Sequence, residues 1–248
     1  NFNEMIDRLK DQQDKLIINE RHEAWGSLAR KLAHEIKNPL TPIQLIIDRL
    51  KNKYSSELTE KNKNEFKENL KIINSQIKQI EKLVNEFSDF ARMPKPIFQK
   101  IDLIILMKDN IKLLQELDET IKIDFKNNIK QILFNSDKEQ LSRVFLNLIK
   151  NSIESIQQKT EKVSNFNKII AIELNDLDSH ISLIINDNGI GFKDLNNIKE
   201  ILNPYFTTKK QGTGLGLSIV NKIINDHNGN IEFISKEDGA MIKITFTK

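Results

Sequence analysis

Almost nothing in the first 92 residues would interrupt a helix. Gly26, Pro39 and Pro42 are the only glycine and prolines in this stretch. Apolar residues recur there every three or four positions, the spacing that places side chains on one helix face. The two main series are Ile36, Leu40, Ile43, Ile47 and Leu50, and Phe66, Leu70, Ile73, Ile77, Ile80, Val84 and Phe87. Long amphipathic helices are therefore expected over most of this region.

Two such helices joined by a short polar segment predict a helical hairpin. Residues 54–61 carry no apolar stripe and are expected to form the turn. A hairpin with one apolar stripe per helix buries little surface by itself, so a second copy is expected to complete a dimeric four-helix bundle. Residues 1–24 carry a similar heptad seam, formed by Phe2, Met5, Leu9 and Leu16.

The pattern changes at residues 93–97, where Pro94 and Pro96 end the second helix and mark a domain boundary. Beyond this point, helices are predicted at residues 101–117 and 138–158. Runs of β-branched and aromatic residues predict strands at 169–174, 181–186, 231–234 and 241–246. The second domain is expected to be a mixed sheet with helices packed on it, which makes the fold class α+β.

The composition excludes several classes of function. A net charge of +3 without a dense basic block gives no support for nucleic-acid binding. Because the chain has no cysteine, disulfides, thiolate zinc sites and a cysteine nucleophile are excluded. No apolar run reaches the roughly 18 residues that would span a bilayer, and Asn1 begins no signal-peptide pattern. We therefore expect a soluble piece of a longer protein.

The first candidate for chemistry is the histidine of the segment His34-Glu35-Ile-Lys-Asn38-Pro39. His34 lies off the apolar seam, and Asn38 follows one helical turn later on the same face. A neutral imidazole is a good nucleophile near pH 7, and Glu35 could orient the ring or accept its proton. Pro39 removes a backbone hydrogen bond in this turn and permits a local bend. The alternative is a surface histidine without a function.

Two polar groups in the second domain are the next candidates. Asn147 and Asn151 lie one helical turn apart, and an asparagine oxygen can be the single protein ligand of Mg²⁺, whose other ligands are phosphate and water. Asp187 directly follows the predicted strand 181–186, and a carboxylate at a strand end can accept a hydrogen bond from an exocyclic amine such as that of adenine. Gly189 and Gly191 would let the backbone approach a flat ligand. A polar helix face and a plain Asp-Asn-Gly turn are the alternatives.

A glycine-rich segment, Gly212-Thr-Gly-Leu-Gly216, opens an amphipathic helix. The backbone N–H groups of such a loop and helix can bind phosphates, although no Lys-Ser or Lys-Thr follows to make a P-loop. Residues 192–211 before it are long for a connection, which is typical of a lid. Lys209 and Lys210 would lie beside bound phosphate. A ligand-free turn and a solvated basic pair are the alternatives.

The order of these motifs resembles that of two-component sensor histidine kinases. His34-Glu-x-x-Asn-Pro is similar to their H box, and Asn147-x-x-x-Asn to their N box. The G1, F and G2 boxes are matched by Asp187-Asn-Gly-Ile-Gly, Pro204-Tyr-Phe-Thr-Thr-Lys and Gly212-Thr-Gly-Leu-Gly-Leu. The resemblance extends from about Trp25 to the C-terminus. Residues 24–44 are similar to the NtrY-like branch, and residues 2–16 resemble the end of a HAMP linker.

The resemblance implies a signalling helix at residues 1–24, a dimerisation and phosphotransfer domain at 25–92, a linker at 93–97 and an ATP-binding Bergerat (GHKL) α/β sandwich at 98–248. It implies autophosphorylation with ATP and Mg²⁺, transfer to an aspartate of an NtrX-like response-regulator receiver domain, and dephosphorylation of that regulator. It also implies a homodimer that forms the cytoplasmic portion of an inner-membrane sensor, with the membrane reached only through preceding segments.

The resemblance assigns a role to individual residues of this chain. His34 would accept the phosphoryl group, Glu35 would be its acid–base partner, and Asn38 would help to position the phosphoryl group or water. In the second domain, Asn151 would hold Mg²⁺ and Asp187 would bind the adenine amine. The other nucleotide contacts would come from Asn147, Lys150, Gly189, Gly191, Phe206, Lys209, Gly212, Gly214, Leu215 and Gly216.

The sequence departs from the family pattern at a few positions. Ser152 and Ser155 stand where the family usually has alanine, and His227-Asn228-Gly229 replaces His-Gly-Gly. The last glycine box is reduced to Asp238-Gly239-Ala240. Two other functions stay open at this point: a nucleotide-binding scaffold that docks a regulator without autophosphorylating, and a Bergerat ATPase unrelated to signalling.

Overall fold

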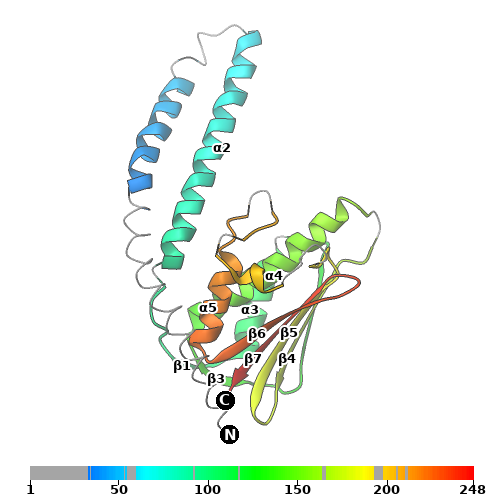
Figure 1. Ribbon diagram of the computed structural model, residues 1–248. Coiled ribbons are helices and arrows are strands. Elements are labelled where there is room, and N and C mark those ends of the chain that lie inside the picture. The colour runs from blue at the N-terminus through cyan, green and yellow to red at the C-terminus, as the bar shows by residue number, and fades with distance from the viewer. Residues whose placement is uncertain are drawn as a thin grey trace. The chain divides into compact units, whose positions relative to one another are not determined.

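The computed structural model divides into two compact units, Asn1–Pro94 and Lys95–Lys248. Figure 1 shows a helical hairpin in the first unit and a sheet with helices in the second. Each unit is described by itself below. The described residues are 33, 35–52, 54, 60–91, 93–116, 118–163, 166–192, 198–204, 206–209 and 212–248.

The first unit pairs a helix of residues 35–52 with α2 (Glu60–Ala91). One buried cluster joins the two helices, formed by Leu40 and Ile47 on the first and Leu70 and Ile77 on α2, with Phe66 packed against it. In each helix these residues are seven positions apart, the heptad spacing of helices that pack side by side. The hairpin is therefore as predicted, although most of the predicted turn lies outside the described residues.

Half of the predicted apolar seam is not buried within this hairpin. Ile36 and Ile43 were expected to face the same core as Leu40, but they are 40% and 43% exposed. On α2, Ile73 and Ile80 are likewise exposed. A helix at three-four spacing presents two neighbouring stripes, and one partner helix covers only one of them. Their exposure in the single chain is compatible with the predicted four-helix bundle, in which a second hairpin would cover the remaining stripe.

The second unit is built on a five-stranded mixed sheet in the order β2-β4-β5-β7-β6. The strands are β2 (Lys122–Asn127), β4 (Ile169–Asp176), β5 (His180–Asp187), β6 (Gly229–Ser235) and β7 (Ala240–Thr247). Only β2 and β4 pair in parallel; the other neighbours are antiparallel. β1 (Gln99–Asp102) and β3 (Leu133–Ser136) form a separate two-stranded sheet.

One face of the large sheet carries the apolar core of the unit. Along β7, for example, Ile242, Ile244 and Phe246 are buried while the residues between them are partly exposed, which is the two-residue period of a half-buried strand. The helices are α3 (Leu103–Gln115), α4 (Lys138–Thr160) and α5 (Gly216–Asp226). Figure 1 shows them together on one face of the sheet, so the unit is a two-layer α/β sandwich.

Capping side chains set where two of these helices begin. Asp102 accepts a hydrogen bond from the backbone N–H of Ile104 and starts α3. Asp137 does the same for Gln140 at the start of α4. The helix predicted from residue 101 therefore begins two residues late, because Ile101 and Asp102 belong to β1.

The four predicted strands are present, and each is two or three residues longer than expected. β1, β2 and β3 were not predicted. β2 is an edge strand in which only Ile123 and Phe125 are apolar, alternating with Lys122, Asp124 and Lys126, so its apolar signal is short. The predicted loop between β5 and α5 contains a short 3-10 helix, Ile198–Leu202. No helix in the described part of the chain is long and apolar enough to cross a membrane.

Candidate nucleotide-binding site

The turn that follows β5 holds a buried carboxylate. Asp187 is only 5% exposed, and each of its oxygens accepts one hydrogen bond. The backbone N–H of Gly189 donates to Oδ1 at 3.0 Å, and the Ser152 hydroxyl, from α4, donates to Oδ2 at 3.0 Å. Because a carboxylate oxygen can accept more than one donor, acceptor capacity is left for a ligand amine.

Burial raises the pKa of Asp187 above its ordinary value. The hydrogen bonds from the Gly189 backbone N–H and the Ser152 hydroxyl act in the opposite direction, with smaller effects from Ala240 and Ser155 nearby. The carboxylate is thus costly to bury, and its two hydrogen bonds offset part of that cost. Such a perturbed acid at the end of a strand marks a functional site.

The turn is packed so closely that it needs glycine. A Cβ added at Gly189 would lie 2.2 Å from the Ser155 Oγ atom, and one at Gly239 would lie 1.8 Å from the backbone oxygen of Asp187. Gly191 and Gly239 also have positive φ angles, 71° and 98°. The remnant glycine box at Gly239 therefore serves to let the β6–β7 turn approach the turn after β5.

The second candidate group lies on α4, beside the segment before α5. The Asn151 Oδ1 atom accepts a hydrogen bond from Lys209 Nζ at 2.9 Å, and Lys209 also forms an ion pair with Glu154. A cation thus already contacts the oxygen that the family resemblance assigns to Mg²⁺. Carbonyl-type oxygens are among the ligands that suit Mg²⁺, so the donor atom of Asn151 fits that ion as one protein ligand.

Asn147 lies one turn earlier on α4 and faces the glycine-rich segment. A Cβ added at Gly216 would lie 3.1 Å from Asn147 Oδ1, so Gly216 allows the start of α5 to come close to α4. The Asn147 side-chain amide donates to the backbone oxygen of Arg143 at 2.8 Å. Lys150, by contrast, is exposed and lies 4.0 Å from Glu154.

The glycine-rich segment contacts the residues that precede it. Gly212 donates its backbone N–H to the Lys209 oxygen at 3.1 Å, and a Cβ there would lie 2.4 Å from Thr207 Oγ1. Gly214 has a φ of 69°, and the buried Leu215 precedes α5 without a side-chain cap. The open backbone N–H groups at this helix start can bind an anion.

The remaining predicted residues are placed as follows. Phe206 is half-buried, and its backbone N–H donates to Asn203. Glu35 and Asn38 are exposed on the hairpin, in the other unit. His34 lies outside the described residues. The structure therefore brings the predicted nucleotide residues together around α4, the turn after β5 and the start of α5, all within the second unit.

Sequence reasoning missed several residues that hold this site. Ser152 and Ser155 were noted only as small replacements for alanine, and Lys159, Glu154 and Gly239 had no role. The available signal was spacing, because residues 152, 155 and 159 are three and four positions apart and share one face of α4.

Comparison with known proteins agrees with this architecture. Residues 136–248 match the family described as histidine kinase-, DNA gyrase B- and HSP90-like ATPase. Residues 24–96 match the His Kinase A phospho-acceptor domain. The chain is 42% identical over 99% of its length to a sensor histidine kinase named NtrY-like from Rickettsia prowazekii, and 34% identical over 95% to the nitrogen regulation protein NtrY of Azorhizobium caulinodans. It spans about 40% of the length of the Rickettsia relative.

Solved structures give the same result for the fold. The catalytic domain of histidine kinase ThkA, 28% identical, covers 61% of this chain with a TM-score of 0.54, and 96% of that domain is matched. Histidine kinase ThkA in complex with response regulator protein TrrA covers 97% of the chain at a TM-score of 0.63 and 23% identity, with 67% of that structure matched. With a phospho-acceptor domain followed by this ATPase domain, the chain belongs to the sensor histidine kinase family.

Proposed function

We propose that this chain is the kinase core of a two-component sensor, which phosphorylates itself on His34 with ATP and passes the phosphoryl group to an aspartate of a response-regulator receiver domain. The observation that carries this proposal is the buried carboxylate of Asp187, which keeps acceptor capacity in a turn closed around it. An ATPase that recognises adenine needs such a hydrogen-bond acceptor. The chain also has a histidine, His34, in the part of the sequence that forms its other unit.

The proposed chemistry depends mainly on positioning and charge neutralisation. The His34 imidazole nitrogen attacks the γ-phosphorus in line; an N–P bond forms while the bond to the ADP oxygen breaks. Glu35 takes the ring proton. Asp187 accepts a hydrogen bond from the adenine amine. The backbone from Gly212 to Gly216 faces the phosphates, together with the side chains of Asn147, Lys150 and Lys209. Mg²⁺, when bound at Asn151, neutralises phosphate charge.

The lysine at the site has a defined place in this scheme. Lys209 neutralises Glu154 and donates a hydrogen bond to the Asn151 oxygen. Asn151 would hold Mg²⁺ through this oxygen, and the Lys209 ammonium group would supply positive charge to the phosphates. Phe206, three residues earlier and half-buried, would anchor the segment.

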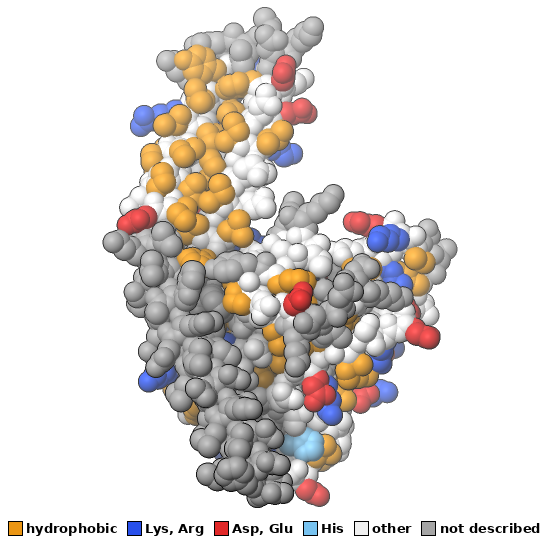
Figure 2. All heavy atoms as spheres, in the orientation of Figure 1, with side chains coloured by type: hydrophobic (Ala, Val, Ile, Leu, Met, Phe, Trp, Pro, Cys, Tyr) orange, Lys and Arg blue, Asp and Glu red, His pale blue; other side chains and the backbone are white. Residues whose placement is uncertain are grey.

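A homodimer is proposed from the uncovered face of the hairpin. Ile36, Ile43 and Leu50 recur every seven residues on the first helix, and Ile73 and Ile80 do so on α2; all five are exposed in the single chain. Figure 2 shows hydrophobic side chains along much of the visible face of the hairpin. An apolar surface of this kind marks an interaction site, and a second hairpin would cover it as a four-helix bundle.

The remaining parts of the proposal follow from the family. We propose the domain limits 1–24, 25–92, 93–97 and 98–248. The partner is proposed to be an NtrX-like regulator, because the relatives carry NtrY names and the related kinase ThkA is known in complex with a response regulator. Asn38, exposed one turn from position 34, would position water when the regulator is dephosphorylated. Residues 1–24 would connect to a HAMP linker and a membrane span.

The proposal is tested by incubating the chain with γ-labelled ATP and Mg²⁺. We expect label that survives base and is lost in acid, as a phosphoramidate is, and a His34→Gln variant that takes up none. Replacement of the exposed neighbour, Glu35→Gln, should slow labelling without moving it to another residue. Label retained by His34→Gln would refute the assigned nucleophile, and ATP binding without label would favour a nucleotide-binding scaffold.

A further inference from the structure

A polar stripe on α4 contacts every residue of the turn that follows β5. The stripe consists of Ser152, Ser155 and Lys159, spaced three and four residues apart on one helix face. The turn consists of residues 187–190. The stripe is polar, and so are Asp187 and Asn188 of the turn, whereas the helix and the sheet around them pack through apolar side chains. The contacts between stripe and turn are therefore specific rather than a by-product of burial.

Each member of the stripe makes a different contact. The Ser152 hydroxyl donates to Asp187 Oδ2 at 3.0 Å, and the Ser155 Oγ atom accepts the backbone N–H of Ile190 at 3.0 Å. Lys159 Nζ donates to the backbone oxygen of Asn188 at 2.7 Å. Gly189 fits between them because a Cβ would meet the Ser155 hydroxyl. The stripe thus fixes both the carboxylate and the backbone that carries it.

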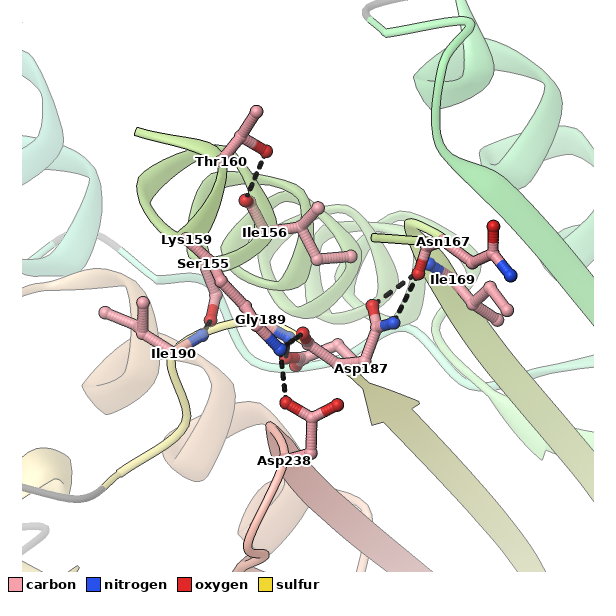
Figure 3. A network of polar contacts seen from close by, with 11 residues as sticks. Ser155, Ile156, Lys159, Thr160, Asn167, Ile169, Asp187, Gly189, Ile190 and Asp238 are labelled. Carbon is pink, nitrogen blue, oxygen red and sulfur yellow. Dashed lines mark hydrogen bonds and ion pairs between the residues drawn. The ribbon is translucent and has the colours of Figure 1, made fainter. Parts of the chain in front are cut away.

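Lys159 also connects the turn to other parts of the unit. Its ammonium group pairs with Asp238 in the turn between β6 and β7, and lies 4.7 Å from the centre of the Phe166 ring. Figure 3 shows Lys159 reaching the turn after β5 and Asp238 together. Its side chain is only 16% exposed, so the charge is held in one place rather than moving freely in solvent.

The turn is also held from the side of the sheet. The Asn188 side-chain oxygen accepts the backbone N–H of Ile169 at 3.0 Å, and its amide donates to the backbone oxygen of Asn167 (Figure 3). These contacts fix the backbone at position 188. Among the described residues, the α4 stripe orients the Asp187 carboxylate from the helix side.

We propose that Ser152, Ser155 and Lys159 are positioning residues that set the Asp187 carboxylate for recognition of a purine amine and thereby give the site its preference for adenine. Ser152 leaves one face of Oδ2 free while fixing the carboxylate plane. Ser155 and Lys159 fix the backbone from which that side chain projects. This inference rests on the proposed ATP-binding function and adds to it the residues that would make binding selective.

The experiment compares binding of ATP and of inosine triphosphate, which has the same sugar and phosphates but a carbonyl in place of the amine. The purified chain is titrated with each nucleotide, as wild type and as Ser152→Ala and Lys159→Met. A hydrogen bond to a charged group is worth roughly tenfold or more in binding. We expect each variant to bind ATP about tenfold more weakly and inosine triphosphate as the wild type does.

Matched controls come from the same helix. Ser142 donates to Asn110 and Lys138 is exposed at the start of α4, so Ser142→Ala and Lys138→Met should leave the ATP preference unchanged. Ser152→Ala introduces the residue that the family usually has there, and its melting temperature is recorded to show that it folds.

The outcomes separate the inference from the proposed function. Variants that bind both nucleotides like the wild type, or that lose both equally, overturn the inference and leave ATP binding in place. A wild type that binds the two nucleotides equally overturns both the adenine assignment of Asp187 and the inference. A wild type that binds neither overturns the proposed function and the inference with it.

Discussion

At the scale of single residues, the site keeps a charge where burial opposes it. Asp187 is nearly inaccessible, and burial raises its pKa in spite of the hydrogen bonds from Gly189 and Ser152. Between the ordinary value of 3.8 and the raised value, the native state binds more protons than the unfolded state. The free energy of unfolding therefore falls as the pH rises through this window. Such a residue is retained for binding rather than for stability.

Replacement of this carboxylate should separate the two properties. We expect Asp187→Asn to raise the melting temperature at pH 7, because no charge is buried, and to match the wild type near pH 3, where Asp187 is protonated. ATP affinity should fall by about tenfold or more, since the remaining oxygen is used by the Gly189 N–H. Thermal melts and nucleotide titration measure both effects, with exposed Asp178→Asn as control. A less stable variant at pH 7 would contradict this account.

At the scale of elements, the end of α5 is joined to the start of α4 through a buried histidine. His227 Nε2 accepts the backbone N–H of Asp137 at 3.0 Å, and Nδ1 lies 2.8 Å from the backbone oxygen of Ile223, so Nδ1 carries the proton. α5 ends at Asp226 with His227 as its C-cap, and the next residue, Asn228, has a φ of 55°. Asparagine here takes the left-handed position that glycine commonly fills after a helix.

The conformation of Asn228 leads to a prediction for stability. An alanine at this position has no favourable way to adopt a left-handed backbone, so Asn228→Ala should lower the free energy of unfolding by about 1 kcal/mol. Asn228→Gly should cost nothing, because glycine adopts this conformation freely. Urea unfolding of the three chains tests this expectation. Equal losses for alanine and glycine would show that the asparagine side chain, and not its φ angle, is what matters.

At the scale of the whole molecule, the two units differ in how much of their apolar surface they bury. The second unit covers the apolar face of its sheet with its own helices. The hairpin buries Leu40, Ile47, Leu70 and Ile77 but leaves a second apolar stripe exposed. The second stripe is the surface on which the proposed dimer would form.

Association should therefore depend on the exposed stripe. We expect Ile73→Lys to shift the chain from dimer to monomer in sedimentation, because a lysine there would be buried between hairpins without a partner charge. The dissociation constant should rise at least tenfold, on the order of the cost of one unpaired buried charge. Asn85→Lys places the same side chain at an exposed polar position of α2 and should leave the dimer intact. A dimer that survives Ile73→Lys would refute this interface.

Sequence by itself determined the kind of each long element and the chemistry available to it. Heptad spacing predicts the hairpin, since periodicity is a local property that a helix expresses wherever it packs. Local pattern also predicted the shared helix face of Asn147 and Asn151 and the strand before the turn at Asp187. The polar strand β2 was not, because it depends on a partner, β4, that lies more than forty residues further along the chain.

Only the tertiary structure decided which surfaces meet. Periodicity could not choose between Leu40 and Ile43, because both belong to apolar stripes and only packing buries one of them. The roles of Ser152 and Lys159 were equally invisible, since a serine or lysine on a helix gains its function from a turn some thirty residues away. The physical reason is the same in both cases. A local sequence pattern indicates which interactions a side chain can make, whereas tertiary contacts between distant segments determine which of them it does make.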